Sequence, residues 1–250
     1  MAVNAADVAA SPERTNRSWA PPAAITPRGT VVLLPGRGEH AGVYERFGLR
    51  LSADGYLVTA LATSPESTED AAHRLAELVA DDPPVPIVFI GSDTGALHAL
   101  ALSGSATAVV AAGTPLADGP LSGDTATQWS AELAARTACP THRARLTDDR
   151  DLRRGAVLTE PVPAELIDRA AAARPTIPVL FVHGATDPLA PLEPVRKLAA
   201  NLPNASVAIV RDGRHDALND INHRTVAAEI VQFLERVRAT PTAIPILSVE

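Results

Sequence analysis

Residues 87–95, Ile-Val-Phe-Ile-Gly-Ser-Asp-Thr-Gly, decide the fold of this chain. A short apolar run of strand length leads directly into a Gly-x-Asp-x-Gly turn. Such a turn is typical of the sharp elbow between a buried strand and the next helix, where small neighbours let one side chain project over the edge of a parallel sheet. The projecting residue is usually a serine. Here it is Asp93, so the sequence predicts a carboxylate where a hydroxyl is usual.

Strand-like and helix-like segments alternate outward from this elbow. The predicted strands lie at 30–34, 56–61, 87–90, 108–111, 178–182 and 206–210. The predicted helices lie at 43–53, 69–79, 95–102, about 191–201 and about 222–237. Strands separated by single helices are typical of a parallel sheet with helices on both faces, so the sequence predicts an α/β protein.

The division of the chain follows from where this alternation holds and where it stops. The predicted parts are a loose N-terminal arm (1–28), a core in two pieces (29–113 and 176–238), an insertion (114–175) and a tail (239–250). The insertion contains helical pieces around 126–137 and 163–173, with a charged segment at 142–154 between them. Long excursions from a compact sheet frequently cover a binding site. We therefore expect a short helical lid over one end of the sheet.

Composition argues against several classes of partner and cofactor. The net charge of −7 and the pI of about 5.5 argue against nucleic acid and anionic membrane surfaces. No run of apolar residues is long enough to span a bilayer, and the first residues lack the pattern of a signal peptide, so we expect a cytoplasmic location. The only cysteine is Cys139 and no Cys or His pair has ligand spacing, so we expect no metal and no cofactor. Lys197 is the only lysine, which indicates the coding bias of a GC-rich bacterium.

Three polar residues lie in the loops that follow predicted strands: Asp93, Asp187 and His215. The carboxyl ends of parallel strands meet at one edge of a sheet, where ligands bind in open α/β folds. The order nucleophile, acid, histidine along the chain is the order found on the α/β-hydrolase fold. The sequence therefore predicts an Asp93–His215–Asp187 triad.

Each member of this triad has a role that follows from its chemistry. Asp93 is the candidate nucleophile, His215 the general base, and Asp187 the carboxylate that fixes the tautomer of the imidazole. Backbone amides of Thr94, at the start of a helix, and of Arg37, in the loop after the first predicted strand, are the candidate oxyanion hole. We expect the Arg37 side chain to be solvated and to take no part in the chemistry.

The loops around these residues resemble those of a known group of enzymes. Residues 35–40, Pro-Gly-Arg-Gly-Glu-His, with Tyr44 nearby, resemble the His-Gly-x-Gly-Glu-His segment of monoacylglycerol-lipase and lysophospholipase-like hydrolases. The loops at 184–188 and 213–220 resemble the acid and histidine loops of that branch. The resemblance covers roughly 29–113 and 177–237 and implies the α/β-hydrolase fold.

The chain departs from that branch at three places. Pro35 replaces the first histidine, the loop at 62–66 is short, and Asp93 replaces the serine. An aspartate at the elbow is similar to the haloalkane dehalogenases and soluble epoxide hydrolases. That similarity implies attack of Asp93 on a saturated carbon, followed by hydrolysis of the resulting ester by water that His215 activates.

The residues that assist the leaving group in those enzymes are not matched. Dehalogenases of this type have a tryptophan after the aspartate, where this chain has Thr94. Epoxide hydrolases use lid tyrosines, but Tyr44 and Tyr56 both lie outside the insertion. An acid in the insertion would have to be Cys139, His142 or an arginine.

We predict a hydrolase of the α/β-hydrolase superfamily that opens an epoxide or an activated carbon–heteroatom bond of a small organic molecule. Trp129 is the only aromatic residue of the insertion and the candidate substrate-binding residue. Two alternatives stay open: a non-covalent Asp/His acid–base enzyme (a cyclase, lyase or isomerase of secondary metabolism), and a catalytically silent binding protein of the same fold. The sequence also leaves open the substrate, the roles of Cys139 and His142, and whether the chain forms a homodimer.

Overall fold

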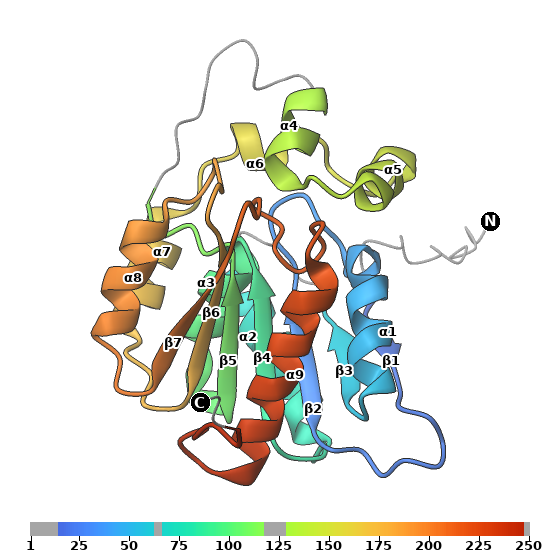
Figure 1. The fold of residues 1–250 in the computed structure, drawn as a ribbon, viewed down its shortest axis with the longest axis vertical. Helices are drawn as coiled ribbons and strands as arrows, with labels where there is room; N and C mark the ends of the chain where they lie inside the picture. The colour runs from blue at the N-terminus through green and yellow to red at the C-terminus, as the bar shows by residue number, and fades with distance from the viewer. Residues whose placement is uncertain (1–14, 63–66, 118–128, 248–250) are drawn as a thin grey trace, which may run out of the picture.

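A computed structural model describes residues 15–62, 67–117 and 129–247 of the chain. The described strands form one sheet in the order β1-β3-β2-β4-β5-β6-β7 (Figure 1). They are β1 (Arg17–Trp19), β2 (Thr30–Leu34), β3 (Leu57–Ala60), β4 (Ile87–Ser92), β5 (Ala108–Ala112), β6 (Val179–Gly184) and β7 (Ala205–Val210). β1 pairs antiparallel with β3, and every other neighbouring pair in this sheet is parallel. The predicted, mostly parallel sheet is confirmed.

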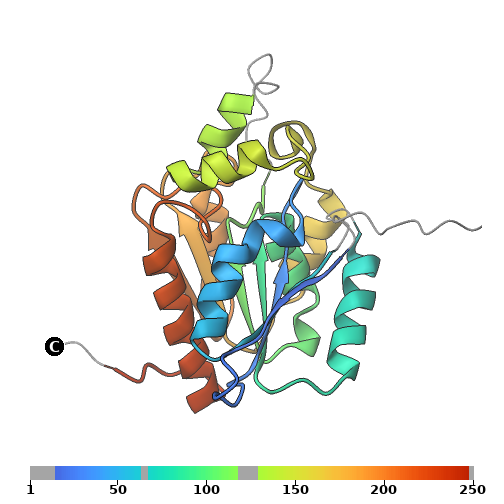
Figure 2. The same ribbon diagram turned by 90° about the vertical axis from the view of Figure 1, so that its right-hand side faces the viewer.

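Helices cover both faces of the sheet, as the alternation of segments predicts (Figure 2). One face is covered by α1 (Glu45–Ala53) and α9 (His223–Ala239), and the other by α2 (Thr68–Ala80), α3 (Thr94–Ala101), α7 (Ala164–Ala172) and α8 (Leu192–Ala200). Because side chains alternate along a strand, Val31 and Leu33 belong to the first core, whereas Val32 and Leu34 belong to the second. No helix in the described part of the chain is long and apolar enough to cross a bilayer.

Three helices, called the upper helices below, lie above the carboxyl ends of the strands (Figure 1). They are α4 (Trp129–Arg136), α5 (Pro140–Asp148) and α6 (Ala156–Thr159). The sequence predicts a helix near α4, whose expected first turn at 126–128 lies outside the described residues, but it predicts neither α5 nor α6. Leu146 is the only apolar residue that α5 buries, so this segment has no apolar periodicity to detect.

The edge strand β1 is a second difference from the sequence prediction. It lies within residues 1–28, which we expected to be a loose arm, yet Trp19 pairs with Val58 of β3. The Trp19 ring also packs over Gly48, where an added Cβ would lie 2.3 Å from the ring. A three-residue strand is too short to show alternation in the sequence, and its position depends on this tertiary contact.

Candidate active site

The elbow holds Asp93 in a backbone conformation that few residues adopt. Asp93 has φ 51° and ψ −123° and joins β4 to α3. The glycines on either side allow the turn to pack tightly, because a Cβ on Gly91 would lie 2.0 Å from the carbonyl oxygen of Gly95. A Cβ on Gly95 would lie equally close, at 2.0 Å, to the carbonyl oxygen of Leu34. The turn therefore places the Asp93 side chain at the carboxyl edge of the sheet, where the motif predicts it.

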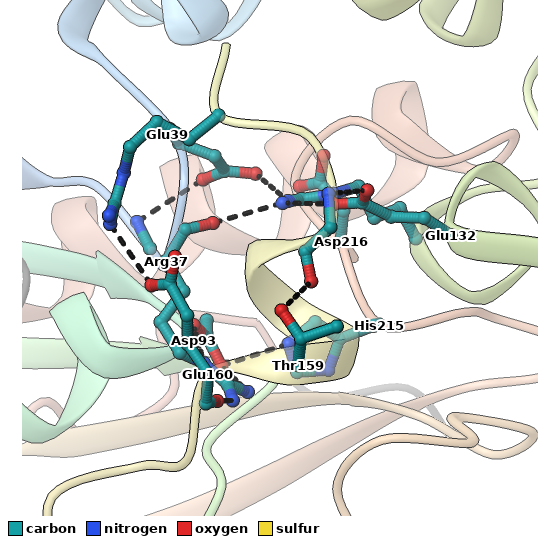
Figure 3. Close-up of polar contacts among 12 residues, drawn as sticks. Arg37, Glu39, Asp93, Glu132, Thr159, Glu160, His215 and Asp216 are labelled. Carbon is teal, nitrogen blue, oxygen red and sulfur yellow. Dashed lines mark hydrogen bonds and ion pairs between the residues drawn. The ribbon is translucent and has the colours of Figure 1, made fainter. Parts of the chain in front are cut away.

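The structure brings the three predicted triad residues together. His215 Nε2 lies 3.2 Å from Asp93 Oδ1, and His215 Nδ1 lies 2.9 Å from Asp187 Oδ2 (Figure 3 shows the first contact). Each of these side chains is at most 3% exposed. The amides of Leu189 and Ala190 donate to the other oxygen of Asp187, which fixes that carboxylate. The imidazole is therefore held between two buried carboxylates.

These contacts set the charges of the triad. Burial alone would lower the pKa of His215, but the charges of Asp187 and Asp93 and their hydrogen bonds raise it to about 10. Burial alone would raise the pKa of Asp93, but the Arg37 charge and the hydrogen bonds from His215 and Arg37 hold it well below its usual value. The pKa of Asp187 is lowered against burial by the charge of His215. At neutral pH the imidazole is thus protonated and both carboxylates are ionised.

The Arg37 side chain overturns the expectation that it is solvated. It is buried against the carboxylate of Asp93: Nε donates to Oδ2 and a terminal NH2 donates to Oδ1, each over 2.8 Å (Figure 3). Its other terminal nitrogen donates to the main-chain oxygen of Glu160 over 2.6 Å. The sequence gives no signal for this contact, because a surface loop arginine and a buried one look alike until the loop is placed beside the elbow.

The two predicted oxyanion amides have different surroundings. The Arg37 amide donates to Asp93 Oδ2 over 2.8 Å, so one oxygen of the carboxylate already lies where an oxyanion would form. Thr94 is the buried first residue of α3. Within the described residues its hydroxyl has no hydrogen-bond partner, and no bond from its amide to Asp93 is found.

A buried arginine that the sequence does not single out, Arg136, connects the upper helices to residues 35–40, the loop after β2 that carries Arg37 and is called the oxyanion loop below. It lies at the end of α4, is 1% exposed, and donates to Glu39 over 2.8 Å and to Glu132 over 2.9 Å. It also donates to the main-chain oxygen of Arg37 over 2.9 Å. Figure 3 shows Glu39 and Glu132 facing each other across this cluster.

The same end of α4 supports the histidine loop through its main chain. The amide of Asp216 donates to the carbonyl of Arg136 over 2.9 Å, and the amide of His215 donates to that of Ala135 over 3.3 Å. Because these carbonyls belong to the last turn of α4, they are the groups a helix leaves without internal partners. The histidine is therefore positioned by a helix from the predicted insertion as well as by its own strand.

The remaining candidates have described contacts with residues other than the triad itself. Trp129 donates through its indole nitrogen to Thr147, and its ring lies under the Arg154 guanidinium, 4.9 Å away. Its described contacts are thus with α5 and the segment after it, not with Asp93. His142 forms a buried 2.6 Å contact with Asp216, and Cys139 is buried at the start of α5. Neither has a described contact with the elbow carboxylate, although His142 bonds the residue that follows His215.

One group of side chains in the described residues has the composition of a metal site. Ligand atoms of His40, Asp149 and Asp151 lie within 4.8 Å of one another. His40 Nδ1 accepts from the amide of Gly42, and Nε2 lies 2.9 Å from Asp149. These contacts satisfy the imidazole without a metal ion.

The raised pKa of His215 predicts how stability changes with pH. The folded protein keeps a proton up to about pH 10 that an unfolded histidine loses near pH 6.5. The stabilisation is therefore complete below about pH 6.5 and falls as pH rises to about 10, with a slope approaching 1.4 kcal/mol per pH unit. Denaturant unfolding at intervals from pH 6 to pH 10 measures it. His215→Gln, which cannot titrate, is expected to lose this part of the slope, and equal slopes in both proteins would contradict the assignment.

Comparisons with known proteins agree with this architecture. A family model described as alpha/beta hydrolase family matches residues 31–229. No curated protein matches the chain in sequence.

Solved structures with the same fold include several lipases and esterases. A monoacylglycerol lipase from Paleococcus ferrophilus has a TM-score of 0.72 at 19% identity, and the match covers 89% of this chain and 98% of the lipase. A soluble variant of monoglyceride lipase from Saccharomyces cerevisiae has a TM-score of 0.70 at 17% identity, with 89% and 91% covered. A thermostable carboxyl esterase from Bacillus coagulans has a TM-score of 0.64 at 16% identity, with 89% and 94% covered. At these identities the likeness concerns the fold.

Proposed function

This chain belongs to the alpha/beta hydrolase family, and on that premise we propose that it hydrolyses an epoxide or an activated carbon–heteroatom bond through an ester formed on Asp93. The prediction of a hydrolase of this superfamily is confirmed at the level of the family. The observation that carries the finer proposal is the orientation of the Asp93 carboxylate. Its Oδ2 accepts the amide of Arg37, and its Oδ1 faces His215 Nε2.

This orientation gives the two oxygens different tasks. Oδ1 attacks the carbon of the substrate, and the bond from that carbon to its heteroatom breaks with the electron pair leaving on the heteroatom. Oδ2 then becomes the carbonyl oxygen of the ester and stays on the Arg37 amide. Negative charge develops on this oxygen when water adds to the ester carbonyl, and the amide is already in place to stabilise it.

The charge state of His215 fits the two steps. While Asp93 is ionised, the imidazole is protonated and cannot accept a proton from water. In the first step a halide leaves without a proton and an epoxide oxygen takes one from solvent, because it departs on the side of the carbon opposite to Oδ1, which His215 contacts. Ester formation also removes the Asp93 charge, so the pKa of His215 falls and the neutral imidazole can take a proton from the attacking water. When the ester breaks, the imidazolium gives this proton to the departing alcohol. The carboxylic acid left on Asp93 then passes the second proton of the water to His215, and the resting ion pair re-forms.

The same electrostatics disfavour the acid–base alternative. A carboxylate whose pKa is held well below its usual value is a weak proton acceptor. A protonated His215 is likewise unable to act as the base. A non-covalent isomerase or lyase would need one of these two groups to accept a proton in the resting state.

One observation favours the silent binding protein as a second candidate. The Arg37 guanidinium donates hydrogen bonds to both oxygens of Asp93 and to the main-chain oxygen of Glu160. Attack by Oδ1 requires this guanidinium to move away from it. If it does not move, the pair is a structural element and the chain has no turnover.

A trapping experiment separates these candidates. His215→Gln protein is incubated with a panel of small alkyl bromides and epoxides. It is expected to gain the mass of the alkyl group from a bromide or of the whole molecule from an epoxide, because the ester then lacks a base for its hydrolysis. Intact-mass spectrometry measures the gain, and peptide mapping locates it on Asp93. Asp93→Asn in the same background is the control and is expected to gain no mass. A His215→Gln protein that stays unmodified by every probe would support the binding protein.

A further inference from the structure

The environment of the Arg37 guanidinium restricts the charge of the substrate. Arg37 is 6% exposed, and its side chain makes three described hydrogen bonds: two to the Asp93 carboxylate and one to the main-chain oxygen of Glu160 (Figure 3). Asp93 is the only carboxylate bonded to it among the described residues. Asp93 is therefore the one anion that the guanidinium is bonded to, while the more distant charge of Glu160 adds to the effect of Asp93 on the pKa of Arg37, which burial opposes.

The ion pair between Arg37 and Asp93 exists only while Asp93 is ionised. In the resting state Asp93 and Asp187 are negative, and Arg37 and His215 are positive. An ester on Asp93 removes one negative charge. His215 can release its proton in response, but the guanidinium of Arg37 cannot.

Nearby acids do not take over this role. The carboxylate of Glu160 pairs with Arg153 at 3.1 Å, on the exposed side of the segment after α6. Glu39 and Glu132 are both bonded to Arg136, which carries one positive charge for the two of them. A neutral substrate would thus leave a buried arginine without a hydrogen-bonded counter-charge at the moment the ester forms, which is unfavourable.

We infer that the substrate supplies this counter-charge through a carboxylate bonded to the carbon that Asp93 attacks. The inference rests on the proposed ester route and names its substrate class: a 2-halocarboxylate or an oxirane carboxylate. The substrate carboxylate takes the two nitrogens of Arg37 that Asp93 occupies at rest, since a guanidinium fork matches a carboxylate. This exchange frees Oδ1, and it holds the neighbouring carbon close to it.

The covalent step is balanced for a 2-halocarboxylate. The Oδ1–carbon bond forms as the carbon–halogen bond breaks, and the electron pair leaves with the halide. The substrate carboxylate stays ionised on Arg37 throughout. Hydrolysis of the ester then gives a 2-hydroxycarboxylate, and the returning Asp93 charge competes for Arg37 and favours product release.

The test compares matched acids and amides. His215→Gln protein is incubated with 2-bromopropanoate or 2-bromopropanamide. For each probe, the rate of mass gain is divided by the rate at which the same probe alkylates free acetate, which corrects for its intrinsic reactivity. The normalised rate is expected to be at least tenfold higher for the acid. In Arg37→Gln/His215→Gln protein this ratio is expected to fall to about one, whereas Arg37→Lys, which keeps the charge but loses the fork, is expected to keep part of the preference.

The outcomes separate this inference from the proposed function. Modification of Asp93 by the amide at an equal or higher normalised rate would overturn the carboxylate requirement and leave the ester route standing. A preference for the acid that survives Arg37→Gln would also overturn it, because a different group would then bind the carboxylate. Failure of both probes and of the neutral panel to modify Asp93 would remove the ester route, and this inference with it.

Discussion

Asp93→Asn is expected to lower the free energy of unfolding by about 3–5 kcal/mol at pH 6, because it leaves the buried Arg37 guanidinium without a counter-charge. The substitution keeps the shape of the side chain, and asparagine tolerates the positive φ of 51° better than most residues. The loss therefore reports on charge more than on packing or backbone strain. The site also loses one of the two carboxylates that hold the proton on His215.

The matched control removes both charges of the pair. Arg37→Met/Asp93→Asn leaves no unpaired ion at the elbow and is expected to recover most of the stability that Asp93→Asn loses. Urea unfolding of the wild type, both single variants and the double variant measures the coupling. A single Asp93→Asn variant as stable as the wild type would mean that solvent, and not Asp93, neutralises Arg37.

Arg136→Met is expected to destabilise the protein by a similar amount, about 3–5 kcal/mol. The substitution leaves Glu39 and Glu132 buried without their cation, and their side chains are only 3% and 1% exposed. It also removes the donor to the main-chain oxygen of Arg37. The pKa of Glu39 is already raised by burial and by the charge of Asp216, and loss of Arg136 would raise it further. The penalty is therefore expected to shrink as pH falls and the carboxylates take up protons.

Arg169→Met is the surface counterpart of this change. Arg169 also pairs with two glutamates, Glu165 at 2.6 Å and Glu69 at 3.3 Å, but its side chain is 46% exposed. Exposed pairs contribute little, so this variant is expected to stay within about 0.5 kcal/mol of the wild type. Equal losses for the two variants would show that the Arg136 cluster is not the link between the upper helices and the oxyanion loop.

Much of the fold could be predicted because its signals are local. The buried strands are short apolar runs, and α2 and α9 carry apolar residues at helical spacing. Helix α5 has no such spacing, and it is held by contacts such as Arg145 with Glu45 over 2.7 Å. Ion pairs of this kind join residues far apart in the chain, so no window of sequence reveals them.

By itself, the sequence determined the elbow and the order of the triad, because the spacing of glycines and the run of strands allow only one edge of the sheet for Asp93, Asp187 and His215. Only the tertiary structure decided what surrounds that carboxylate. Arg37 lies 56 positions before Asp93, and Arg136 lies 99 positions after Arg37. These partners meet because the oxyanion loop and α4 both fold over the carboxyl edge of the sheet. Since the charged groups are buried there, they interact strongly, and each one is stabilised by its partners.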